Sequence, residues 1–209
     1  MKNLIACVNT AKTNELKNLV ARRIKEFKSL GNKDSKELFK ELCFCILTAN
    51  FTAERGMKIQ SAIGEGFLTF SERRLASKLR ELGHRFPNTR ASYIVEARKH
   101  AEDLKRIVHS SFDDVNDLRE WLADNVKGLG FKESSHFLRN IGFDNIAIID
   151  FHIIDFLVKF NMIKKPTTIT RKNYLEIESV LKKIAKAMDV NLAELDLYLW
   201  YCETGRVLK

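Results

Sequence analysis

Two residues whose side chains could carry out chemistry, Lys132 and Asp150, lie a short distance apart in the sequence. A neutral lysine amine is a nucleophile that can attack C1′ of a deoxyribose and form a Schiff base. A nearby carboxylate can stabilise the positive charge that develops on the sugar and assist proton transfers. Each residue alone has an ordinary alternative: Lys132 could be a solvated or phosphate-binding lysine, and Asp150 could cap a helix. The surrounding sequence is needed to choose between the catalytic and the ordinary interpretation of each residue.

Lys132 follows a glycine-containing turn. Gly128-Leu129-Gly130 separates a predicted helix that ends near Asn125 from one that begins near Phe131. Glycine permits tight backbone angles and close approach of another chain, and the free amides at a helix start can bind a phosphate. A helix-hairpin-helix over 114–141 would therefore hold a DNA backbone without reading its bases. For the two glycines alone, a plain turn between packed helices is the alternative.

The rest of the chain has the pattern of an all-α protein with about ten helices and short loops. It contains only two prolines, and apolar residues recur at helical spacing. Asp34, with Glu37 three residues later, predicts the start of a helix that runs to about Thr48 and is buried on most faces. Only 146–149 looks strand-prone. An earlier helix is predicted where Leu16, Leu19, Val20, Ile24 and Phe27 recur at helical spacing. Further helices are predicted at about 52–64, 71–82, 89–109, 114–126, 131–141, 150–160, 171–188 and 191–204.

Charge and composition narrow the class of partner. The net charge is +9, which favours a polyanion such as nucleic acid, although surface lysines also serve solubility. Apolar runs are too short for a membrane span or a signal peptide, so we expect a cytoplasmic, nucleoid-associated protein. The four cysteines have no spacing suited to zinc or an iron–sulfur cluster, and Cys43 and Cys45 are expected to be buried, reduced thiols.

Several segments together resemble one known family. They are Cys43–Thr52, Leu82–Phe86, Gly128–Lys132, Ser135–Asn140, Ile149–His152 and Gly205–Lys209. The chain resembles, over essentially its whole length, the helix-hairpin-helix DNA glycosylase superfamily, and within it the archaeal-type (type 2) 8-oxoguanine DNA glycosylase/lyase. The resemblance implies a single domain over 1–209 with two helical lobes and a DNA-binding cleft between them. We expect one lobe to comprise 1–51 plus 149–209 and the other 52–148.

The resemblance also implies roles for individual residues. Lys132 would be the catalytic nucleophile and Asp150 its partner, in excision of 8-oxoguanine followed by β-elimination at the abasic site. A lysine needs a lowered pKa to act in this way. Phe86 and Trp200 would stack on the extruded base, with core packing as the alternative for both. The carboxylate of Lys209 would accept the N7 hydrogen of the oxidised base, although chain ends are often frayed. Asp196 would contact the base edge.

The DNA contacts implied by the resemblance involve both lobes. Asn50 would fill the gap left in the duplex and contact the orphaned cytosine, or else simply end a helix. Arg139 and His152 would contact phosphates, with a structural histidine as the alternative for His152. The backbone at Gly128 and Gly130 would hold the DNA strand and could bind a monovalent cation through carbonyl oxygens. We expect no side-chain metal site, no iron–sulfur cluster, no membrane contact and a monomer that binds double-stranded DNA containing 8-oxoguanine.

Two other functions remain alternatives from the sequence. One is a helix-hairpin-helix glycosylase for a different lesion, such as thymine glycol or mispaired adenine. Many of those carry a four-cysteine iron–sulfur cluster, for which this chain lacks the residues, and monofunctional relatives lack the lysine. The other is a non-catalytic DNA-binding module, which would need the glycines and the basic charge but not both Lys132 and Asp150.

Overall fold

The computed structural model describes residues 1–209 and contains only helices and connecting segments. No helix combines the length and hydrophobicity that crossing a membrane requires. The helices are α1 (Lys2–Ala11), α2 (Asn14–Gly31), α3 (Ser35–Thr48), α4 (Ala53–Ile63), α5 (Gly66–Thr69), α6 (Glu72–Glu81), α7 (Pro87–Ala97), the 3-10 helix η1 (Arg98–His100), α8 (Leu104–Ser110), α9 (Val115–Asn125), α10 (Phe131–Asn140), α11 (Phe151–Lys159), α12 (Arg171–Ala187) and α13 (Leu192–Thr204).

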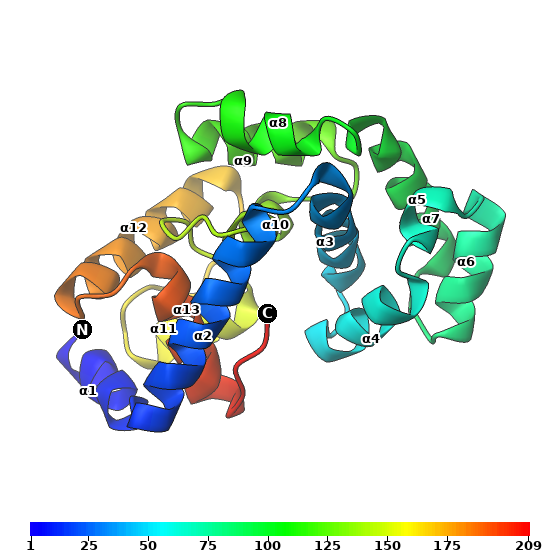
Figure 1. The fold of residues 1–209 in the computed structure, drawn as a ribbon. Coiled ribbons are helices and arrows are strands. Elements are labelled where there is room, and N and C mark those ends of the chain that lie inside the picture. The colour runs from blue at the N-terminus through cyan, green and yellow to red at the C-terminus, as the bar shows by residue number, and fades with distance from the viewer.

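The helices form two lobes, each with its own hydrophobic core (Figure 1). The middle lobe is built from α3 to α10, and its core runs from Leu38 to Ile146. The terminal lobe combines α1 and α2 with α11, α12 and α13, so that both ends of the chain contribute to it. Two lobes in one chain leave a groove where they meet, and the segments that cross between them lie beside that groove.

Local sequence signals explain where most helices begin. The Asp34 side chain accepts a hydrogen bond from the Glu37 amide at 3.0 Å and starts α3, as the sequence predicts. Asn191 and Glu194 form a reciprocal capping box at the start of α13. The apolar stretch of α3 is buried through Leu47, and Cys43 and Cys45 are buried thiols within it.

The structure differs from the sequence prediction in several elements. The helix predicted over 89–109 is divided into α7, η1 and α8, because the chain turns at Arg98, whose guanidinium donates to the carbonyl oxygens of Phe67 and Phe70. The short helices α1 and α5 were not predicted. The strand-prone residues 146–149 lie in a segment without regular structure, because no partner strand exists for them to pair with.

The position of α3 also differs from the predicted division of the lobes. The boundary after residue 51 assigned α3 to the terminal lobe, but its buried side chains from Leu38 to Leu47 belong to the middle core. The second predicted boundary, after residue 148, lies close to the change of core between Ile146 and Ala147. Helix α10 packs against α9 and α3 of its own lobe and against α2 of the other (Figure 1). The lobes are therefore joined by helix packing as well as by the chain.

Candidate active site

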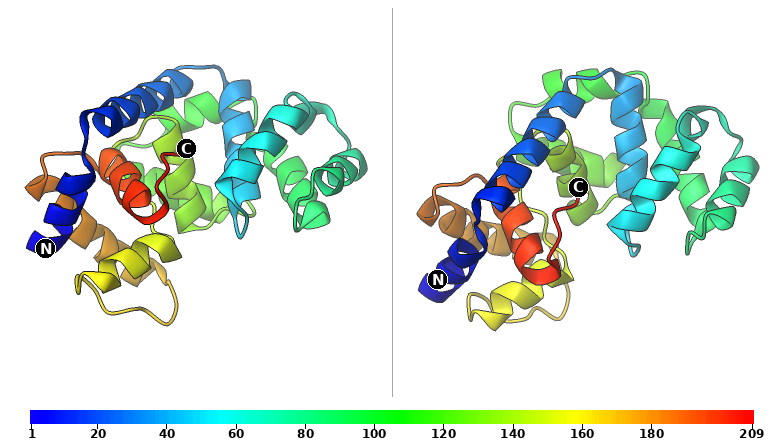
Figure 2. Two further views of the ribbon diagram at one scale, coloured as in Figure 1. Left: turned by 90° about the horizontal axis from the view of Figure 1, so that it is seen from below. Right: turned by 60° about the horizontal axis from the view of Figure 1, so that its bottom comes forward.

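A cleft of about 900 Å³ lies where the two lobes meet. One side is formed by the segment between α3 and α4, and the other by the start of α11 and the last turns of α13. Both views in Figure 2 show the C-terminal segment running from α13 toward this region. Of the site residues expected from the sequence, the cleft is lined by Asn50, Lys132, Arg139, Asp150, His152, Asp196, Trp200 and Lys209.

The helix-hairpin-helix is formed as predicted by α9, a short turn and α10. Gly128 has a φ of +91°, and a Cβ atom there would lie 2.4 Å from the Tyr93 ring, so only glycine fits. The exposed Gly130 precedes α10, and its N–H donates to the Glu133 carboxylate at 3.3 Å. The following amides, from Phe131 to Glu133, occupy the first turn, where a helix leaves its N–H groups without intrahelical partners.

Lys132 occupies the first turn of α10 and lines the cleft. Its side chain is 25% exposed, and Nζ lies 3.7 Å from Oε1 of Glu133. The amine is thus held at the cleft wall by the helix and by one neighbouring carboxylate, while part of it stays accessible to a bound molecule. That is the placement a nucleophile needs.

Asp150 lines the same cleft from the other lobe and caps α11. Its Oδ1 accepts a hydrogen bond from the Ile153 amide at 3.0 Å. The cap interpretation and the catalytic interpretation are therefore compatible, because the cap fixes the carboxylate in position and engages only one of its two oxygens. The fold brings Lys132 and Asp150 to one cleft from different helices.

His136 and Arg139 follow Lys132 along α10 and form the inner part of the cleft. His136 is buried, and neither ring nitrogen has a hydrogen-bond partner. Burial, together with the positive charges of Arg139 and Lys132, lowers the pKa of His136 well below its ordinary value, so its imidazole is neutral. The ring lies near the backbone of Lys209, which opposes part of this pKa shift, and it lines the cleft beside that residue.

Arg139 lies inside the cleft rather than on the outer surface. Its side chain is 4% exposed, Nη2 is 3.7 Å from Oδ2 of Asp196, and the guanidinium lies over the Phe27 ring at 4.6 Å. Two of its nitrogens have no hydrogen-bond partner. Because Arg139 is buried and lies next to Asp196, its position favours a role in holding Asp196. From the sequence we expect a phosphate contact for Arg139 instead.

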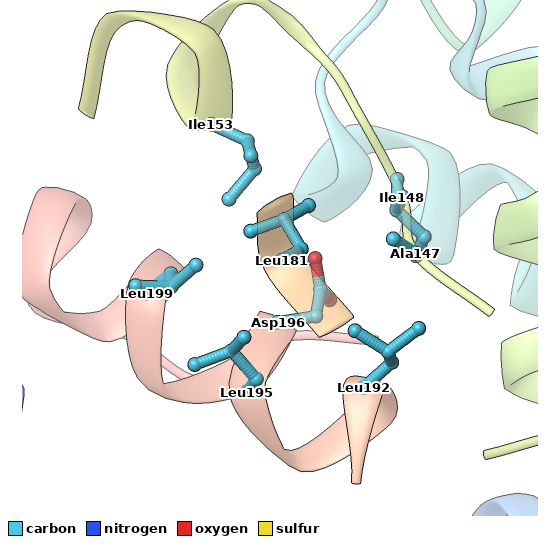
Figure 3. A pocket seen from close by; sticks show the side chains of 8 residues that line it. All are labelled: Ala147, Ile148, Ile153, Leu181, Leu192, Leu195, Asp196 and Leu199. Carbon is cyan, nitrogen blue, oxygen red and sulfur yellow. The ribbon is translucent and has the colours of Figure 1, made fainter. Parts of the chain in front are cut away.

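Asp196 is a carboxyl group in a largely apolar setting. Figure 3 shows it among apolar side chains that include Leu181, Leu192 and Ile148. Burial raises the pKa of Asp196 from 3.8 to about 6, although Arg139 opposes the shift; the nearby charge of Asp150 adds to it. The group therefore changes its charge near neutral pH, where most aspartates remain ionised.

The aromatic residues expected to hold a base lie in different settings. Trp200 lines the cleft, and its indole Nε1 is buried without a hydrogen-bond partner. The ring of His152 meets Trp200 edge to face, with centroids 5.0 Å apart. Phe86 does not line the cleft: it is 36% exposed beside the guanidinium of Arg85, which does. Trp200 thus lies at the cleft wall and Phe86 outside it.

Lys209 lines the cleft and is tied to the middle lobe by its own side chain. Its Nζ lies 2.7 Å from Oε2 of Glu41 and donates to Oε1 of Gln60 at 2.6 Å. Glu41 is buried and also accepts from Asn140 at 2.6 Å. The last residue is therefore anchored rather than frayed.

Some cleft residues were not selected from the sequence. His136 is one of them, although its spacing of four residues from Lys132 places it on the same helix face. Two apolar side chains also present exposed surface at the cleft: Phe151, next to Asp150, is 66% exposed, and Ile169 is 46% exposed.

Asn50, which we expect from the sequence to reach the orphaned base, has a positive φ of 59° directly after the α3 C-cap. Only asparagine, aspartate and glycine adopt that conformation readily.

An all-α fold with a helix-hairpin-helix, a lysine at its second helix and an aspartate across the cleft defines a helix-hairpin-helix DNA glycosylase. A family model described as 8-oxoguanine DNA glycosylase matches residues 20–190. A relative from Korarchaeum cryptofilum, named 8-oxoguanine DNA glycosylase/AP lyase, is 53% identical and is covered over 98% of its length by 99% of this chain. The chain belongs to the 8-oxoguanine DNA glycosylase family.

Solved structures agree with this assignment. The Methanocaldococcus jannaschii 8-oxoguanine glycosylase/lyase, in complex with a 15mer DNA containing 8-oxoguanine, matches with a TM-score of 0.95 and 52% identity over 99% of each chain. The Thermotoga maritima 8-oxoguanine DNA glycosylase matches with a TM-score of 0.94 and 42% identity, covering 100% of this chain and 99% of that one.

Proposed function

We propose that the protein excises 8-oxoguanine from double-stranded DNA and then cleaves the strand at the abasic site, with Lys132 as the nucleophile. The observation that carries this proposal is the arrangement of Lys132 and Asp150 at one cleft, directly after a hairpin suited to a DNA backbone. The relatives' shared name, 8-oxoguanine DNA glycosylase/AP lyase, supports the same substrate and both activities.

The chemistry starts with the damaged nucleotide turned out of the duplex into the cleft. The neutral amine of Lys132 attacks C1′, the bond from C1′ to the base breaks, and the base leaves with the bonding electrons and gains a proton. Asp150 stabilises the positive charge on the sugar during this step. Opening of the sugar ring gives a Schiff base between Lys132 and C1′. Loss of a C2′ proton then eliminates the 3′ phosphate, and hydrolysis of the Schiff base frees the lysine.

The inner cleft provides the proposed base pocket. Trp200 offers an aromatic face and an unpartnered N–H, and Asp196 offers a carboxyl group for the base edge. Lys209, anchored by Glu41, ends the pocket with the acceptor that the family resemblance assigns to the N7 hydrogen. Phe86 lies outside this lining, so stacking by Phe86 requires the bound DNA to bring the base toward it or its loop to move inward.

Duplex contacts are proposed on both sides of the pocket. The amides after Gly128 and Gly130 would hold one phosphate, and His152 another. Asn50 lies opposite, where it can enter the space that the extruded base leaves. The carbonyl oxygens of Lys127 and Gly128 accept no backbone hydrogen bond, so the hairpin can offer oxygen ligands to a monovalent cation. A monomer presents one complete cleft, and we propose that the protein acts in that form.

Replacement of the nucleophile tests the proposal. Lys132→Gln should abolish excision of 8-oxoguanine from a duplex carrying one such base, and should abolish covalent trapping by borohydride. Lys183→Gln is the matched control, because Lys183 is an exposed lysine on α12, away from the cleft. Retained trapping in Lys132→Gln would show that another residue attacks the sugar. Equal losses in both variants would show that the loss is not specific to Lys132 and would remove the support for its role.

A further inference from the structure

The two residues of the proposed catalytic pair belong to different elements. Lys132 lies on α10, whereas Asp150 ends the segment 141–150, which contains neither helix nor strand. A buried segment without regular structure must find other partners for its backbone groups. The relative position of Lys132 and Asp150 therefore depends on what binds this segment from inside the molecule.

Tyr174 of α12 contacts both elements through one hydroxyl group. The hydroxyl lies 3.0 Å from Oγ of Ser135, which is one helical turn after Lys132 on α10. It also lies 2.8 Å from the Ala147 carbonyl oxygen and accepts a hydrogen bond from the Ile149 amide at 3.2 Å. Ile149 directly precedes Asp150. The Tyr174 hydroxyl oxygen therefore contacts both the helix that carries Lys132 and the segment that ends at Asp150.

A buried ion pair holds Tyr174 in place. Glu178, one turn further along α12, accepts hydrogen bonds from Arg119 at 2.8 Å and from the Ala147 amide at 3.0 Å. Both charged side chains are fully or almost fully buried. The Arg119 guanidinium lies over the ring of Tyr174 at 5.4 Å and over that of Phe131, the residue before Lys132, at 4.9 Å. Arg119 Nε has no hydrogen-bond partner, but both carboxylate oxygens of Glu178 and the Tyr174 hydroxyl are paired, and pairing of this kind makes a buried network rigid.

We propose that Tyr174 is a positioning residue whose hydroxyl sets the separation of Lys132 and Asp150 across the cleft. The proposal rests on the function proposed above. Tyr174 is 1% exposed and is not among the residues that line the cleft, so it acts through its neighbours and not on the substrate. Burial raises the pKa of Tyr174, and the hydroxyl keeps its proton at every pH at which the enzyme would work.

Loss of this hydroxyl should affect both chemical steps and leave DNA binding unchanged. Excision and β-elimination both require the sugar to lie between the amine and the carboxylate. A displacement of about 1 Å in such a geometry costs up to about 100-fold in rate. The Tyr174 ring meets the ring of Phe131, at the start of α10, with centroids 5.5 Å apart. The hydroxyl group itself contacts no hairpin amide and no group of the base pocket.

Tyr174→Phe removes the hydroxyl and keeps the ring. We expect the single-turnover rate constants for 8-oxoguanine excision and for cleavage of an abasic duplex to fall together, by about 10- to 100-fold, with the Kd for the duplex unchanged. Rates are expressed per active molecule, from the amplitude of borohydride trapping. Tyr198→Phe is the matched control, because Tyr198 is a buried tyrosine in the same lobe that makes none of the hydrogen bonds of Tyr174 to α10 and the segment 141–150.

Two results would overturn the proposal. One is a rate per active molecule equal to that of the unmodified protein, with only the melting temperature lowered; the other is an equal loss in Tyr198→Phe. If Tyr174→Phe does not fold, Ser135→Ala provides a second test, because it removes the partner of the Tyr174 hydroxyl on α10. This variant should slow both steps. An unchanged rate would show that the contact with α10 does not position Lys132. Trapping that persists in Lys132→Gln would instead contradict the proposed function, whatever the result for Tyr174.

Discussion

Lys209 Nζ lies 2.7 Å from Oε2 of Glu41, although 168 positions separate the two residues in the sequence. Glu41 belongs to α3 of the middle lobe, while Lys209 follows α13 of the terminal lobe. The contact therefore joins the two lobes beside the cleft, which Lys209 lines and Glu41 does not. Because Glu41 is 2% exposed and also binds Gln60 and Asn140, it is a fixed point to which the C-terminal residue is attached.

Glu41→Gln should weaken this attachment. The amide keeps the shape of the side chain but removes the charge that pairs with Lys209, and a hydrogen bond to a charged group contributes about 1.5 to 3 kcal/mol. We expect the free energy of unfolding to fall by about 2 kcal/mol. Excision of 8-oxoguanine should slow more than cleavage of an abasic duplex, because an abasic site has no base to be recognised. Paired single-turnover assays on the two duplexes measure this difference.

Glu65→Gln is the control for that experiment. Glu65 pairs with Lys40 at 2.8 Å but is 67% exposed, so the substitution should change stability by less than about 1 kcal/mol. Equal slowing of excision and abasic-site cleavage in Glu41→Gln would mean that the contact supports the whole cleft and not the base pocket in particular.

Local features of the chain predict the helical class, the hairpin and the segments that bring Lys132 and Asp150 together. Gly128 must be glycine for reasons that act within a few residues, and Asp150 caps α11 from the adjacent position. The burial of Arg139 against Asp196 and the packing of α3 with the middle lobe depend on residues far away in the sequence. Periodicity shows that a helix face is apolar, but not which lobe covers it.

The raised pKa of Asp196 should make the free energy of unfolding decrease as the pH rises, which is the opposite of the effect of an aspartate whose pKa is lowered on folding. Its pKa is about 6 in the folded protein, above the ordinary value of 3.8. The folded state therefore binds the proton more tightly, and the associated stability is present at low pH and lost as the pH rises through about 6. The shift corresponds to about 3 kcal/mol. Urea unfolding between pH 4 and 7 should show the stability of the unmodified protein falling by about that amount relative to Asp196→Asn. A constant difference would contradict the shift.

Gly128→Ala should disturb the hairpin by both strain and collision. The residue has a φ of +91°, and the new Cβ would lie 2.4 Å from the ring of Tyr93. We expect a loss of about 3 kcal/mol in stability and weaker binding of undamaged duplex DNA. Gly205→Ala is the matched control for stability, since Gly205 also has a positive φ, in the left-handed helical region, but open space around it, and should cost only about 1 kcal/mol. Chemical denaturation and DNA titration of both variants test the prediction.

Glu178→Gln should show how strongly the buried ion pair joins the lobes. Arg119 and Glu178 are 0% and 2% exposed, so the substitution leaves a buried guanidinium without its counter-charge, at a cost of about 3 to 5 kcal/mol. Arg106→Gln removes an ion pair with Asp103 whose partners are 65% and 61% exposed, and should cost less than about 1 kcal/mol. The double variant Arg119→Met with Glu178→Gln should recover part of the loss, because no unpaired charge remains buried. A double variant less stable than both single ones, measured by urea unfolding, would mean that the pair itself stabilises the contact between the lobes.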